Sequence, residues 1–140
     1  MSDSLNEFGV ARGTMAMPNH ICDSTPCFGL LHGCMPRNIT PSDMDGVTEM
    51  NGSFWTIEFK KTGKQVPYGQ MLMFERLVKE KGFTVTIIWH DGLTRENKIT
   101  KMQYLTGGIV REKTFSTYEE GRLAYQQFAR WWSSQQEKAA

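Results

Sequence analysis

Residues 41–61, PSDMDGVTEMNGSFWTIEFKK, decide the fold because they contain the clearest hairpin signal in the chain. Asn51-Gly52 stands at the centre, and both residue types tolerate the positive φ angles that a two-residue type I′ turn requires. In the second arm, apolar side chains alternate with mostly polar ones, which is typical of a strand with one packed face. The stretch therefore predicts an antiparallel hairpin with strands at 43–50 and 53–60.

Acidic and basic residues occupy matching positions in the two arms of this hairpin. Counting outward from the two-residue turn places Asp45 opposite Glu58, and the next pair on that face is Asp43 opposite Lys60. Two opposed carboxylates repel and destabilise a sheet unless something compensates. A divalent cation such as Mg²⁺ compensates well, because it prefers carboxylate oxygens. The register therefore favours a metal site, and the alternative is a solvated face with an Asp43–Lys60 ion pair.

The rest of the chain predicts further helices and strands around this hairpin. Pro67 and Gly82 mark the two ends of a helix, and Thr117 with Glu120 forms a capping box before another helix. The predicted elements are a helix at 67–81, a strand at 83–89, strands at 98–105 and 109–115, and a helix at 118–135. This order predicts a mixed β-sheet with flanking helices, an α/β domain with α+β as the alternative.

Asp45 followed by Glu58-Phe59-Lys60 resembles the Asp…(Asp/Glu)-x-Lys signature of the PD-(D/E)XK nuclease superfamily. In that family the Asp lies on one strand of a hairpin and the acid-x-Lys on the next, followed by a helix and another strand. Residues 41–46 and 57–60 are similar to small phage-encoded members in particular, which often carry a glutamine in the helix, as at Gln70 here. The resemblance covers residues 37 to about 90.

The resemblance implies a restriction-endonuclease-like fold and a Mg²⁺-dependent endonuclease acting on DNA, with Mn²⁺ as the alternative metal. The implied site consists of the metal ligands Asp45, Glu58 and the Phe59 carbonyl, the catalytic lysine Lys60, and the supporting polar residue Gln70. The family's proline before its first acid has no counterpart at the same spacing, since Pro41 precedes Asp43 by two residues and Asp45 by four. Asp43 therefore remains the alternative first ligand, although the register favours Asp45.

Basic residues lie both beside the predicted site and on the later strands. Lys61 and Lys64 directly follow the second hairpin strand, so they are candidate contacts to nucleic-acid phosphates. The other group is more typical of a solvated surface, and it consists of Arg95, Lys98, Lys101, Arg111 and Lys113.

The N-terminal segment, residues 1–40, contains a group of cysteine and histidine residues. A tetrahedral zinc site could be formed by Cys22, Cys27, His32 and Cys34. The alternative is three reduced cysteines in a loop, because the single residue between His32 and Cys34 is unusual for zinc and no Cys-x-x-Cys pair is present.

Length and composition fit one domain over residues 1–140, of which 1–40 are expected to be irregular. The net charge of +1 gives no general argument for nucleic-acid binding, and no apolar run is long enough to span a membrane. The start of the chain lacks a secretory pattern, so we expect a cytoplasmic protein, in the host cell if phage-encoded. The alternative to a nuclease is an accessory protein that binds nucleic acid or a host protein without cutting, and a protein partner or homo-oligomer is compatible with both.

Overall fold

The computed structural model describes residue 31 and residues 33–39, 41–92 and 98–139. The chain forms two compact units, Met1–Asp43 and Met44–Ala140. In the first unit the described residues include a short 3₁₀ helix, η2 (Pro36–Asn38). Across the described parts of both units, no helix combines the length and the apolar character needed to cross a membrane.

The second unit is built on a five-stranded mixed sheet, which confirms the predicted α/β fold. Its strands are β1 (Gly46–Met50), β2 (Ser53–Lys61), β3 (Phe83–His90), β4 (Ile99–Thr106) and β5 (Ile109–Thr114). They lie in sequence order across the sheet, and every neighbouring pair is antiparallel except β2 and β3, which are parallel. The crossover between these two strands contains α1 (Tyr68–Leu77), and α2 (Tyr118–Ala139) follows β5.

The hairpin turn and its register agree with the sequence prediction. Asn51 and Gly52 have φ angles of 52° and 85°, and the Gly52 N–H donates a 2.8 Å hydrogen bond to Glu49 Oε2. The ladder of β1 and β2 runs outward from this turn to the pair Gly46 and Ile57. The predicted strand start at residue 43 is wrong, because β1 begins only at Gly46.

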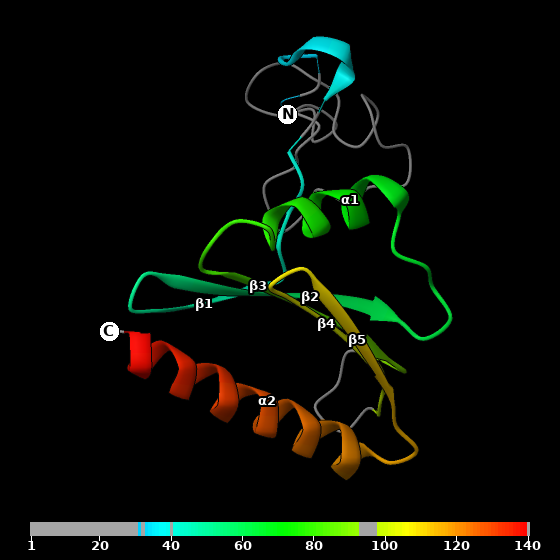
Figure 1. The fold of residues 1–140 in the computed structure, drawn as a ribbon. Helices are drawn as coiled ribbons and strands as arrows, with labels where there is room; N and C mark the ends of the chain where they lie inside the picture. The colour runs from blue at the N-terminus through cyan, green and yellow to red at the C-terminus, as the bar shows by residue number, and fades with distance from the viewer. Residues whose placement is uncertain (1–30, 32, 40, 93–97, 140) are drawn as a thin grey trace, which may run out of the picture. The chain divides into compact units, whose positions relative to one another are not determined.

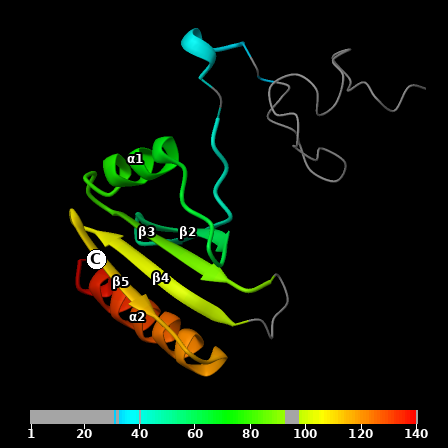
Figure 2. The same ribbon diagram turned by 90° about the vertical axis from the view of Figure 1, so that its right-hand side faces the viewer.

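The two helices cover opposite faces of the sheet (Figures 1 and 2). The core beneath α1 consists of Phe74, Val78, Val85, Ile87, Trp89 and Leu105. The core beneath α2 contains Ile88, Met102 and Tyr104, against which Phe128 of the helix packs. Trp55 of β2 also faces α2, and its ring lies 5.1 Å from Tyr125, 5.1 Å from Phe128 and 5.6 Å from Trp132.

The helix boundaries differ from the prediction in ways that their end residues explain. Pro67 is the N-cap of α1 and not its first helical residue, since its ψ of 143° is extended. Helix α1 ends at Leu77, and a turn carries the chain to Gly82, whose φ of 90° suits glycine. The predicted capping box of α2 is partly realised: Thr117 Oγ1 accepts from the Glu120 N–H at 3.2 Å, but Glu120 Oε2 accepts from Ser116.

Candidate active site

Glu58 is a buried carboxylate on the side of the sheet that faces α1. It pairs with Ile87 of the parallel strand β3, and Ile87 belongs to the core beneath α1. Glu58 is only 5% exposed, so the alternative interpretation of this face as solvated is wrong at this position. Burying a carboxylate costs free energy unless charged or hydrogen-bonding groups surround it, which directs attention to its neighbours.

Lys60 and Gln70 are brought to Glu58 by two different elements. Lys60 lies two residues along β2 on the same face, and its Nζ is 3.4 Å from Glu58 Oε1. Gln70 comes from α1, and its side chain lies close enough to the Glu58 carboxylate to lower the pKa of that group. The structure therefore gathers three of the sequence-predicted site residues at one point under the start of α1.

Asp45 reaches the same place, but not as the predicted ladder partner of Glu58. It precedes β1, and its Oδ2 accepts a 2.7 Å hydrogen bond from the backbone N–H of Phe59. Because the Phe59 N–H is occupied by this side chain, it does not bond to the backbone of the segment before β1, and the pairing of β1 with β2 ends at Gly46 and Ile57. The Asp45 carboxylate also repels that of Glu58, which supports Asp45 as the acid beside Glu58, whereas Asp43 is exposed.

Burial and charge both raise the pKa of Glu58 above its usual range. Desolvation is the larger cause, and repulsion by the Asp45 carboxylate is the second. Hydrogen bonding from Gln70 and the positive charge of Lys60 oppose the rise without cancelling it. The carboxyl group is therefore held in a position where its negative charge is only partly compensated by the protein itself.

Two buried oxygen atoms in this group have no hydrogen-bond partner among the described residues, Glu58 Oε2 and Gln70 Oε1. Both are acceptors, and a buried acceptor without a donor costs about 1–3 kcal/mol. The described residues contain no group of three or more His, Cys, Asp or Glu side chains placed to hold a metal ion. The donor set here, two carboxylates with neighbouring amide and main-chain oxygens, fits an oxygen-coordinated cation that keeps several of its waters.

The remaining predicted site residues lie around this cluster or outside the described residues. Lys61 and Lys64 are exposed at and after the end of β2. Phe59 is 46% exposed, although its position in β2 predicts packing, and its ring meets the edge of His90 at 5.8 Å. Of the predicted zinc ligands, Cys34 is exposed, and Cys22, Cys27 and His32 lie outside the described residues, so the zinc site remains a prediction.

Sequence reasoning missed Thr56 as a member of this site. It is 3% exposed on the same face as Glu58, and its Oγ1 also has no partner among the described residues. The signal was present, because Thr56 precedes Glu58 by one strand period. It was missed because the site was assembled from charged residues of this mostly polar face, and a threonine there carries no signal of its own.

The raised pKa of Glu58 predicts a specific pH dependence of stability. Because folded Glu58 holds its proton more tightly than the unfolded chain does, its contribution is fully present below the ordinary pKa of 4.5. It is lost as the pH rises through the higher folded value. We expect the free energy of unfolding of the parent chain to fall over this window relative to that of Glu58→Gln, in metal-free urea titrations. A constant difference between the two chains across this window would contradict the proposed environment of Glu58.

Comparisons of the chain with protein-family models, with curated proteins and with solved structures found no match in any of the three. The case for a function therefore depends on the chemistry of this cluster and on the sequence signature within it.

Proposed function

We propose that the protein is a metal-dependent nuclease that hydrolyses DNA phosphodiester bonds in the cytoplasm. The observation that carries this proposal is the buried Glu58 carboxylate beside Asp45 and Lys60, with one oxygen that has no hydrogen-bond partner in the described part of the chain. A structural ion pair needs only one acid and one base, whereas two carboxylates with a lysine suit a cation and a phosphate together. The resemblance of these residues to the Asp…(Asp/Glu)-x-Lys signature supports the same conclusion.

Each residue of the cluster then has a distinct role. Asp45 and Glu58 would hold Mg²⁺ or Mn²⁺, with the Phe59 carbonyl as a further ligand. The bound cation supplies positive charge that polarises the scissile phosphate and favours ionisation of water. Lys60 would orient the attacking water and stabilise negative charge on the phosphate, and Gln70 would hold the Glu58 carboxylate in place.

The lysines beside the site complete the proposed interaction with the substrate. Lys61 and Lys64 are exposed and follow Lys60 at the end of β2, so they can contact phosphates next to the one that is cleaved. Such contacts position a nucleic acid without reading its sequence, because the phosphates are the same at every step.

A cleavage assay tests the proposal directly. The purified chain is incubated with supercoiled plasmid and with a single-stranded oligonucleotide, in Mg²⁺, in Mn²⁺ and in EDTA. We expect cleavage of at least one substrate with either metal and none in EDTA. Lys60→Gln should remove most of this activity, because it deletes the ammonium group beside Glu58. Lys79→Gln is the matched control, an exposed lysine in the turn after α1 that should leave the rate unchanged.

The alternative function gives a different result in the same experiment. An accessory protein that only binds nucleic acid would retain the DNA in a mobility-shift assay without cutting it in any metal. Cleavage that persists in EDTA, or that is equal in the parent and Lys60→Gln chains, would contradict the proposed site even if DNA is cut.

A further inference from the structure

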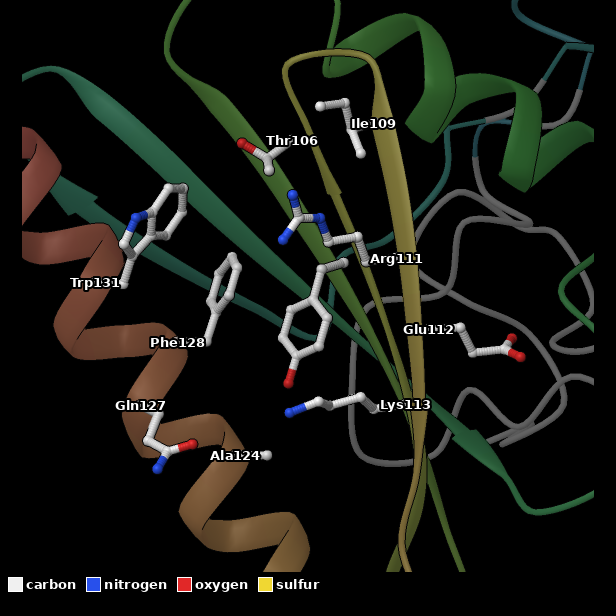
Figure 3. A pocket seen from close by; sticks show the side chains of 10 residues that line it. Thr106, Ile109, Arg111, Glu112, Lys113, Ala124, Gln127, Phe128 and Trp131 are labelled. Atoms are coloured by element: carbon white, nitrogen blue, oxygen red, sulfur yellow. The ribbon is translucent and has the colours of Figure 1, made fainter.

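A groove of about 920 Å³ lies between β5 and α2 (Figure 3). It is separate from the cluster around Glu58, since it opens on the face of the sheet that α2 covers. Its character is set mainly by Ile109, Arg111, Lys113, Gln127, Phe128 and Trp131. The volume lies near the upper end of the range of about 300–1,000 Å³ that is usual for ligand sites.

Strand β5 contributes basic side chains to this groove. Arg111 and Lys113 are alternate residues of that strand, and both extend toward α2 in Figure 3. Glu112 also lines the groove, but its carboxylate points the other way, where it lies 3.7 Å from Lys101 Nζ and accepts a 2.9 Å hydrogen bond from Gln103 Nε2. Among the described residues, neither Arg111 nor Lys113 forms an ion pair. The two cations are therefore available to an anionic ligand.

Helix α2 contributes aromatic side chains to the groove. Trp131 is 46% exposed, while Trp132 beside it is buried in the core. The Trp131 ring lies 5.4 Å from Phe128, which stacks in turn on Tyr104 at 4.5 Å. One side of the Trp131 indole therefore packs against Phe128. The rest of this flat ring is left uncovered by the described residues and is available in the groove.

We propose that this groove binds single-stranded nucleic acid, with a base stacked on Trp131 and phosphates at Arg111 and Lys113. Alternate residues of a strand are roughly 6.6–6.8 Å apart along the chain, comparable to successive phosphates of an extended single strand. Exposed aromatic rings beside a basic track are the usual means of binding such strands without sequence preference.

Two other occupants match the groove less well. In a duplex the bases are already stacked on one another, so Trp131 gains a partner only after costly unstacking. An acidic peptide would satisfy Arg111 and Lys113 but has no obligatory flat ring to place on Trp131. A single strand supplies both the negative charge and the ring.

The test measures binding without cleavage, so its result does not depend on the proposed nuclease function. A fluorescently labelled oligothymidine is titrated with the full chain in EDTA, by anisotropy, at several salt concentrations. Trp131→Ala should weaken binding roughly 5- to 150-fold, as loss of one stacked base does. Arg111→Gln with Lys113→Gln should lower the slope of log affinity against log salt by about 1.4, at about 0.7 per phosphate contact.

Matched variants separate the groove from the rest of the surface. Val47→Ala, an exposed apolar residue of β1, and Arg122→Gln, an exposed arginine of α2 outside the groove, should bind as the parent does. Trp131→Phe should recover part of the affinity, and oligothymidine should quench the fluorescence of the parent but not of this variant. That readout is specific because the other three tryptophans are at most 4% exposed.

Three outcomes would overturn the proposal. The first is no binding of oligothymidine, and the second is equal binding by the parent and the groove variants. The third is displacement of the oligonucleotide by polyglutamate at equal charge concentration, which would indicate an acidic protein partner. A chain that binds through the groove but never cleaves DNA would leave this inference intact and contradict only the nuclease function.

Discussion

Glu58→Gln is expected to cleave DNA roughly 10²- to 10³-fold more slowly than the parent chain in Mg²⁺, the scale of loss when one preorganised charge-stabilising group is removed. Glutamine keeps the size of the side chain and its packing beneath α1, but it removes the negative charge that would hold the cation. Initial rates on the better of the two substrates, at saturating metal, measure the effect.

Thermal unfolding distinguishes this loss of activity from a loss of folding. Without metal, Glu58→Gln should be at least as stable as the parent at neutral pH, because it removes a desolvated carboxylate that Asp45 repels. A cation at one hundred times its Kd should stabilise the parent by about 2.7 kcal/mol and the variant by much less. An inactive variant with a lowered Tm, or one that cuts as fast as the parent, would contradict the role assigned to Glu58.

Trp55→Ala is expected to have the largest effect on stability, about 3–5 kcal/mol of unfolding free energy. Trp55 is 2% exposed and fills the space between β2 and α2 against three aromatic rings. Its Nε1 also donates a 2.8 Å hydrogen bond to the buried Thr86 Oγ1. For a domain of this size the Tm should fall by on the order of 15 °C, measured by circular dichroism.

Graded variants test the physical cause of this effect. Trp55→Phe keeps a ring in the cavity but leaves the Thr86 hydroxyl without its donor, so it should cost about 1–3 kcal/mol. Trp131→Ala removes the same residue type from an exposed position of α2, and it should cost within about 1 kcal/mol. If Trp131→Ala destabilises the chain as much as Trp55→Ala, the core beneath α2 is not centred on Trp55.

The hairpin was predictable because its information is local. Asn51-Gly52 strongly favours a two-residue turn, and the length of that turn determines which residues of β1 and β2 oppose each other. The neighbourhood of Asp45 and Glu58 followed from counting along the chain. Gln70 was placed near them only by the resemblance to the nuclease signature, and its position under the start of α1 depends on how that helix lies against the sheet.

The features that sequence reasoning missed depend on packing between distant segments. Glu58 is buried because α1 covers the mostly polar face of β2, and the alternation of β2 alone does not place that helix. The first strand was placed too early because nothing local shows that Asp45 would bond to the Phe59 N–H. The groove beside β5 depends on where α2 packs across the sheet. The spacing of apolar residues predicts that α2 is a helix, but it does not predict where that helix lies.

Because β1 is an edge strand, the two acids of the candidate site are held with different local stability. Asp45 directly precedes β1, a five-residue strand that pairs on one side only, whereas Glu58 lies in β2, which is paired on both sides. Edge strands open at lower free energy than central ones, so the first acid can leave while the second stays in place. A cation bound between the two acids would stabilise β1 against local opening. The β1 amides should then exchange hydrogen more slowly when the cation is bound than when it is absent.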